Sequence, residues 1–217
     1  MSGIFFVPDP IDNDSKSGIM KMKDVNVLEQ AKTRDHKIHI TDIAISKISR
    51  VDLSDFSEEQ CIIMQEKHKT LLRTAQTQNG SNEVLFIDDL EFKSEVTVLG
   101  DEFKVSPGKN PFAASVIVNA DRQSLIYMHN HPSTNIFSIG DIDTFVCEAT
   151  IKIMSVVTNQ GDVHILNKLL NYSYDNTRFL LNDIYNSFPD GEFDNRKFVN
   201  TFLKRCKEGG IEYAKSK

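Results

Sequence analysis

The chain reads Met128-His129-Asn130-His131-Pro132-Ser133-Thr134-Asn135-Ile136-Phe137-Ser138-Ile139-Gly140-Asp141 where a strand is expected to end and a helix to begin. Side chains alternate across a strand, so His129 and His131 should face the same side, with Cα atoms about 7 Å apart. Pro132 cannot donate to a sheet ladder, so the strand should end there. Ser138 then occupies an N-cap position, and Asp141 follows in the first helical turn. We therefore expect the loop to return Asp141 towards the two histidines.

Two histidines and one carboxylate with an open fourth position are typical of catalytic zinc, whereas structural zinc sites close with four protein ligands. The alternative is a pair of partly buried histidines beside an ordinary helix cap. Chance gives roughly 0.17 His pairs at i, i+2 in such a chain, and requiring Ser and Asp at fixed positions lowers this about a hundredfold. We therefore predict a Zn²⁺ site formed by His129, His131 and Asp141.

Helix and strand patterns alternate around this stretch. A capping box at Ser57 begins a predicted helix that ends near Thr77, Pro111 begins a second, and a third is predicted from Ile142 to about Ile153. Strands are predicted at 83–87, 96–99 and 124–129, and a hairpin at 155–158 and 163–166. The fold class is therefore α/β over residues 56–170.

The two ends of the chain have different patterns. Two amphipathic helices are predicted after Asn171, with Gly209-Gly210 ending the second, so residues 171–217 are interpreted as a helical appendage. Residues 1–55 are interpreted as an N-terminal arm or extension. Within it, residues 8–24 are rich in Asp, Ser, Lys and Pro, while 38–51 could form a strand or a short helix.

Composition excludes some classes of function. The net charge of −6 argues against general affinity for nucleic acid, and the cluster Lys67-His68-Lys69 beside Glu66 is interpreted as a solvated helix face. The three cysteines form no C-x-x-C pair, which favours reduced thiols in a cytoplasmic protein. No stretch approaches the roughly 20 apolar residues of a membrane span, and the first residues lack a signal-peptide pattern.

The pattern His129-x-His131, a short loop and Ser138-x-x-Asp141 resembles the JAMM (JAB/MPN-plus) metalloprotease motif. The letters His-Asn-His-Pro-Ser are especially similar to bacterial RadC-type and JAB-domain members, and the resemblance covers about residues 60–170. It implies a mixed, cytidine-deaminase-like sheet flanked by helices. Six residues separate His131 from Ser138, where the usual pattern has seven, and we interpret the difference as a one-residue loop shortening.

The resemblance also implies two catalytic residues. Glu83, at the head of a predicted strand, would take a proton from the attacking water and pass it to the leaving amine. Glu91 and Glu95 lie nearby, and the alternative for Glu83 is an exposed strand-end carboxylate. Ser138 would donate a hydrogen bond to the oxyanion of the tetrahedral intermediate. Its alternative is a pure N-cap, and both roles can hold together.

The implied activity is hydrolysis of a peptide or isopeptide bond, with a protein or peptide substrate that could be a ubiquitin-like modifier. A metal-binding interaction module without turnover, linked to mobile DNA or phage, is the main alternative, and zinc-dependent hydrolysis of another bond is a third. Asp143 lies two residues beyond Asp141, but the Ser-x-x-Asp spacing selects Asp141. The remaining histidines are interpreted as surface or helix-face residues: His36, His39, His68 and His164.

Overall fold

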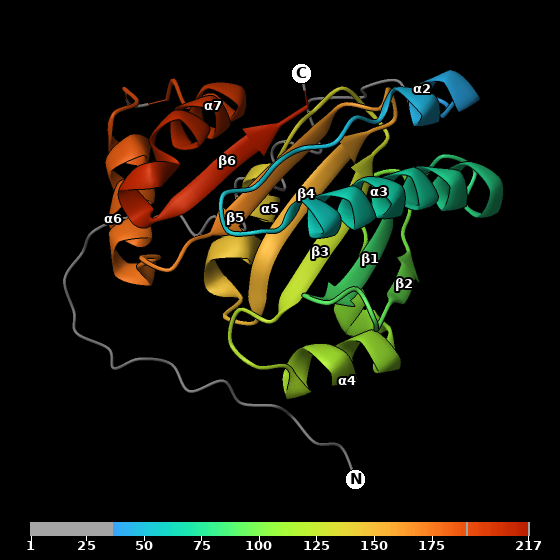
Figure 1. Cartoon of the computed structure of the whole chain (residues 1–217). Helices are drawn as coiled ribbons and strands as arrows, with labels where there is room; N and C mark the ends of the chain where they lie inside the picture. The colour runs from blue at the N-terminus through green and yellow to red at the C-terminus, as the bar shows by residue number, and fades with distance from the viewer. Residues whose placement is uncertain (1–36, 190, 217) are drawn as a thin grey trace, which may run out of the picture.

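The computed structural model describes residues 37–189 and 191–216, so the arm predicted over 8–24 lies outside them. Within this part of the chain, one six-stranded mixed sheet has the order β2-β1-β3-β4-β5-β6 (Figure 1). The strands are β1 (Val84–Asp89), β2 (Val96–Leu99), β3 (Leu125–His131), β4 (Ile151–Thr158), β5 (Val163–Lys168) and β6 (Ile211–Lys215). The helices are α2 (Asp42–Lys47), α3 (Glu58–Gln78), α4 (Pro111–Asn119), α5 (Ile139–Cys147), α6 (Tyr174–Asn186) and α7 (Asn195–Arg205), with 3₁₀ turns η1 (Pro107–Lys109) and η2 (Cys206–Gly209).

Strand β3 is the element that carries both histidines of the motif. It pairs antiparallel with β1 and parallel with β4, so His129 lies between Leu85 on one side and Val156 on the other. A parallel pair needs a crossover connection, and α5 supplies it between β3 and β4. The carboxyl end of β3 and the first turn of α5 therefore meet near the middle of the sheet.

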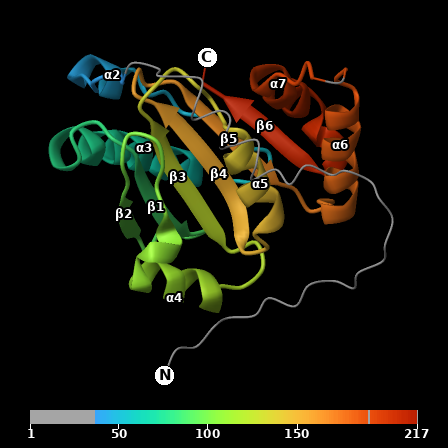
Figure 2. The ribbon, with the colours of Figure 1, turned by 180° about the vertical axis from the view of Figure 1, so that it is seen from behind.

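Helices cover both faces of the sheet, as the views from the two sides show (Figures 1 and 2). Alternate residues of β1 and β3 enter the two cores, as expected for strands buried on both faces. Val84, Phe86, Ile126 and Met128 join the core that includes Leu71 and Leu72 of α3. Leu85, Ile87, Leu125 and Tyr127 join the core that includes residues of α5, α6 and α7, such as Phe145, Leu181 and Phe202.

The predicted α/β class is confirmed, and most elements lie where the sequence placed them. The capping box at Ser57 is present, with Ser57 and Gln60 exchanging side-chain-to-backbone hydrogen bonds. The helix predicted over 142–153 is too long, because α5 ends at Cys147 and a strand begins at Ile151. Ile151 and Ile153 are β-branched and buried, and their segment pairs with β3, so the strand is favoured there.

The C-terminal segment is more than a helical appendage. The two predicted helices are present as α6 and α7, and Gly210 ends the second helical segment in a left-handed conformation (φ 77°). Strand β6 then pairs antiparallel with β5 and forms one edge of the sheet. The prediction missed this strand because Ile211-Glu212-Tyr213 is too short a pattern to reveal it. Phe198 and Phe202 of α7 pack in the same core as β3.

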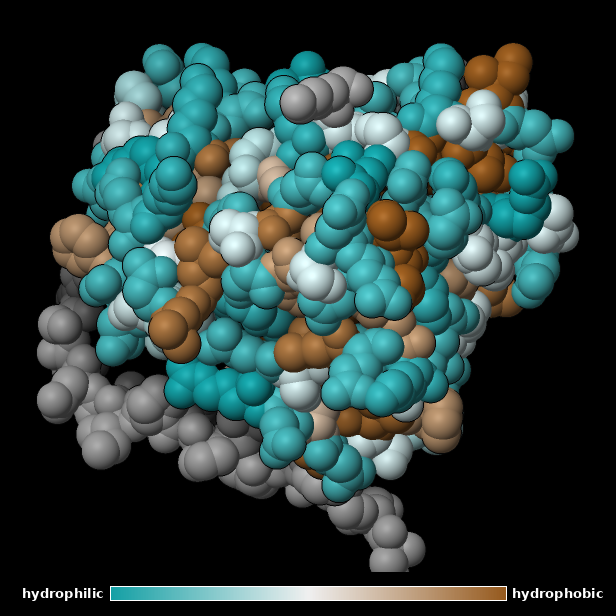
Figure 3. All heavy atoms as spheres, viewed as in Figure 1, coloured by the Kyte–Doolittle hydropathy of each residue, from teal (hydrophilic) through white to brown (hydrophobic). Residues whose placement is uncertain are grey.

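The segment before α3 also belongs to the folded core. Ile40, Ile45 and Ile48 are buried against residues of α3 and the sheet, and α2 begins at an N-cap formed by Thr41. The sequence pattern over residues 38–51 was compatible with a strand or a short helix, and the structure forms the short helix α2 there. Seen from the side of Figure 1, the molecular surface is mostly hydrophilic with scattered hydrophobic residues (Figure 3).

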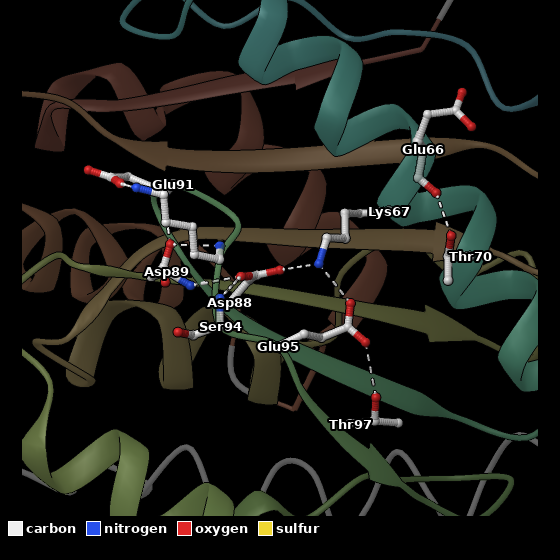
Figure 4. Close-up of polar contacts among 10 residues, drawn as sticks. Glu66, Lys67, Thr70, Asp88, Asp89, Glu91, Ser94, Glu95 and Thr97 are labelled. Atoms are coloured by element: carbon white, nitrogen blue, oxygen red, sulfur yellow. Dashed lines mark hydrogen bonds and ion pairs between the residues drawn. The ribbon is translucent and has the colours of Figure 1, made fainter.

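An ion-pair cluster joins α3 to the β1–β2 hairpin. Lys67 Nζ lies 2.6 Å from Asp88 Oδ2 and 2.9 Å from Glu95 Oε2 (Figure 4). Asp88 is buried and its other oxygen accepts from Ser94 N, so the lysine compensates a buried carboxylate near the end of β1. The next residue, His68, is buried rather than solvated, which corrects the interpretation of Lys67-His68-Lys69 as an exposed face. Its Nε2 lies 2.9 Å from Ser155 Oγ on β4.

Candidate metal centre

The three predicted metal-binding side chains lie together at the end of β3. His129 Nε2 lies 3.1 Å from His131 Nε2 and 3.3 Å from Asp141 Oδ1, and His131 Nε2 lies 3.4 Å from Asp141 Oδ2. One ligand atom from each of the three residues falls within 4.8 Å of the others. Such a set can converge on a single cation, as the spacing of the sequence predicts.

His131 has a hydrogen bond that orients its ring for metal binding. Its Nδ1 lies 3.0 Å from the carbonyl oxygen of Asn135 in the loop after β3. A carbonyl can only accept, so Nδ1 donates a proton in this contact, and Nε2 is the ring nitrogen that can bind a metal once it has lost its own proton. Metal-binding histidines in proteins usually have such a partner for the second ring nitrogen.

Asp141 is held by the N-terminus of α5. The N-cap residue Ser138 donates from its backbone N–H (2.7 Å) and its hydroxyl (2.8 Å) to Asp141 Oδ2. The same hydroxyl accepts from Asp141 N at 3.1 Å, which completes a capping box. The six-residue loop therefore delivers the carboxylate to the histidines despite being one residue shorter than the usual pattern. In this arrangement the hydroxyl proton of Ser138 is directed at Asp141.

The charges of the three residues depend on one another. Burial alone would raise the pKa of Asp141, but the charges and hydrogen bonds of His129 and His131 hold it well below its usual value. Burial alone would lower the pKa of His131, but Asp141 and Glu83 raise it to about 9. The site thus concentrates negative charge around Nε2 of His131. This donor set, two imidazoles and one carboxylate, fits zinc with one position left open.

Glu83 precedes β1 and lies near enough to the candidate metal ligands for the charges of His131 and Asp141 to affect its pKa. Continued two residues past the last pair, Leu85 with His129, this register would place Glu83 opposite His131, and the charges of these two residues affect each other's pKa. Its side chain is buried, with 8% of the residue exposed, so it is not an exposed strand-end carboxylate. Burial raises the pKa of Glu83 to about 8; the charge of His131 acts in the opposite direction and that of Asp141 in the same direction.

The other candidates from the sequence lie elsewhere. Asp143 Oδ1 faces Arg178 at 3.4 Å, in agreement with the choice of Asp141. His164 Nδ1 lies 2.7 Å from Tyr213 Oη, and His39 is exposed. His36 lies outside the described residues. The metal group found among the described residues is His129, His131 and Asp141.

Sequence reasoning missed two asparagines that support the site. Asn130 and Asn159 are both buried, and Asn130 Nδ2 donates to Asn159 Oδ1 at 2.8 Å. Asn159 N also donates to the carbonyl oxygen of His131 at 3.0 Å. Because side chains alternate across a strand, a polar residue between two strand histidines should point to the opposite face of the sheet. This was the feature of the sequence that could have singled out Asn130. Asn159 lies between the two strands predicted for the hairpin, at 155–158 and 163–166, where only a turn was expected.

Comparison with known proteins gives no match to any family model, curated protein or solved structure. Among the described residues, every helix is too short or too polar to cross a lipid bilayer.

Proposed function

We propose that this chain is a zinc-dependent hydrolase of peptide or isopeptide bonds. The observation that carries the proposal is the convergence of His129, His131 and Asp141, two of them oriented by further hydrogen bonds, beside the buried carboxyl group of Glu83. Zinc held there would supply an acidified water and polarise the carbonyl of the substrate. The resemblance to JAMM proteases supports the choice of bond and makes the C-terminus of a ubiquitin-like modifier the first substrate to test.

Glu83 is the proposed general base and acid. A carboxyl group whose pKa lies near neutrality can take a proton from water and return it to a leaving amine. Cationic charge at the neighbouring ligand atoms would favour the ionised form that begins this cycle. Ser138 holds Asp141 in place, and its proposed contact with an oxyanion would require its hydroxyl to turn away from Asp141 Oδ2.

The test combines zinc analysis with cleavage of ubiquitin-like fusions and isopeptide-linked conjugates. We expect about one zinc per chain, cleavage that stops with a chelator, and recovery when zinc is restored. Glu83→Gln should keep zinc but cleave at least about a hundredfold more slowly. Glu91→Gln is the matched control, since Glu91 is exposed on the β1–β2 turn. Equal rates for wild type and Glu83→Gln would remove Glu83 from the mechanism, and absence of bound zinc would remove the proposal itself.

A further inference from the structure

Asn130 lies between the two metal-binding histidines in sequence, but its side chain is on the other face of the sheet and is completely buried. Its Oδ1 accepts from Val84 N at 2.8 Å, and its Nδ2 donates to the carbonyl oxygen of Asn82 at 3.1 Å. An N–H can only donate and a carbonyl can only accept. These two backbone partners therefore fix which way the amide of Asn130 is turned.

The two backbone groups belong to the peptide units on either side of Glu83. The carbonyl of Asn82 is in the unit before its Cα atom, and the N–H of Val84 is in the unit after it. Peptide units are planar, so the φ and ψ angles of Glu83 are the rotations between these two planes. One side chain that binds both planes restrains both angles, and with them the direction in which the carboxyl group leaves the backbone.

The restraint acts where the regular ladder between β1 and β3 has stopped. The last pair is Leu85 with His129, and the next position would pair Val84 with Asn130. There the side chain of Asn130 binds the N–H of Val84 in place of a backbone carbonyl. From the β2 side, backbone bonds hold Glu83: its N–H donates to Asp101 O at 3.0 Å and its carbonyl accepts from Gly100 N at 2.8 Å.

Asn130 is itself held by Asn159, at the end of β4. Asn159 donates from Nδ2 to Ile38 O (2.7 Å) and Ser81 O (3.0 Å), and from its backbone N–H to His131 O (3.0 Å). The amide pair therefore connects the backbone of one metal-binding histidine with the backbone around Glu83. The bonds of Asn159 to Asn130 and to Ser81 are buried, where leaving a polar partner unsatisfied is costly.

We propose that Asn130 is a positioning residue that holds Glu83 in place relative to His129 and His131. The inference rests on the proposed function, in which Glu83 must lie within reach of the attacking water. Asn130 touches no reacting atom in this scheme. It acts through the peptide units on either side of Glu83.

The first test is kinetic. Asn130→Ala should lower kcat about a hundredfold, the loss typical of a small misplacement of a catalytic group, with KM and zinc affinity nearly unchanged. In a Glu83→Gln background the same substitution should cause no further loss, because the group that it positions is already gone. Asn167→Ala is the matched control, since Asn167, on β5, is equally buried but binds Asp55 and, on β6, Glu212. A further large loss in the Glu83→Gln background would overturn the proposal.

The second test needs no substrate. Hydrogen exchange of the Val84 amide should accelerate at least about tenfold in Asn130→Ala relative to that of Phe86 in the interior of β1, and should not change in Asn167→Ala. Unchanged Val84 exchange would overturn the proposal. Should Asn130→Ala fail to fold, Asn130→Ser keeps a hydroxyl that is too short to bind both peptide units, and the same results are expected. Failure of the wild-type protein to cleave any substrate would count against the proposed function, while Val84 exchange would still decide whether Asn130 restrains Glu83.

Discussion

Zinc binding should strengthen steeply between pH 7 and pH 9. In the metal-free protein, burial would lower the pKa of His131, but the hydrogen bond and charge of Asp141, together with Glu83, raise it to about 9. Zinc binds only the neutral imidazole, so it must displace this proton. With a pKa of about 9, roughly one His131 ring in a hundred is neutral at pH 7 and about half at pH 9, which makes binding about 50-fold tighter at pH 9. With an ordinary pKa of 6.5 the same change would be only about 1.3-fold.

The assay is competition with a chromophoric zinc chelator at several pH values, together with calorimetry in two buffers of different ionisation enthalpy. The calorimetry counts the protons released, and at pH 7 we expect about one or more per zinc. Glu83 titrates near the same pH and faces His131, so the released protons belong to the pair. Asp141→Asn, which removes the charge that raises the pKa of His131, should flatten the dependence. An affinity that changes less than about threefold between pH 7 and 9, without proton release, would refute the reasoning.

Three further predictions concern stability and the support of the site. Burial lowers the pKa of His68 to about 3, so below pH 6.5 the unfolded chain binds a proton at this ring more readily than the folded protein does. Acidification from pH 7 to 4 should therefore lower the free energy of unfolding by about 3 kcal/mol more in wild type than in His68→Leu, measured by urea unfolding. Ser138→Ala removes a donor to Asp141 and the N-cap of α5, so zinc affinity should fall about tenfold and stability by about 1 kcal/mol, measured by calorimetry and thermal unfolding. Gly210→Ala should destabilise by about 2 kcal/mol or more, also measured by urea unfolding, because φ is 77° and an added Cβ would lie 2.6 Å from the carbonyl oxygen of Asn171.

Each of these has an outcome that would contradict it. Parallel stability curves for wild type and His68→Leu between pH 7 and 4 would show that the buried ring keeps an ordinary pKa. Unchanged zinc affinity in Ser138→Ala would mean that the carboxylate of Asp141 needs no support from the helix cap. Gly80→Ala is a control for Gly210→Ala, because Gly80 also has a positive φ but an added Cβ there would meet nothing within 4 Å. Equal losses of stability in the two variants would mean that the close contact at Gly210 contributes nothing.

The sequence predicted the strand–loop–helix segment that carries the candidate site better than the limits of the elements around it. The alternation of β3 placed His129 and His131 on one side, and the Ser138 cap placed Asp141 in the first turn of a helix, both from local spacing alone. The extent of α5 was wrong, because Ile151 and Ile153 fit either a helix or a strand until their pairing with β3 is known. The local sequence pattern could not decide between a helix and a strand at these residues.

Contacts between residues far apart in the sequence could not be predicted either, because a local pattern does not reveal them. Burial of His68 depends on Ser155, which lies on a strand 87 positions away. Asn130 is bound by Asn82 and Asn159, and no short pattern in the sequence connects these three. Glu83 was chosen by family resemblance, and its burial beside His131 follows from the register of β1 with β3.

The parallel pairing of β3 with β4 has a consequence for protein engineering. The connection that this pairing demands also carries Asp141, so residues 129–141 contain the whole candidate ligand set within a single strand–loop–helix unit. Such a unit is a candidate for transplantation: grafted onto another scaffold with a strand, a crossover helix and a parallel neighbour, it should bring the three candidate ligands together again. The carboxyl group of Glu83 would have to be supplied separately by the host.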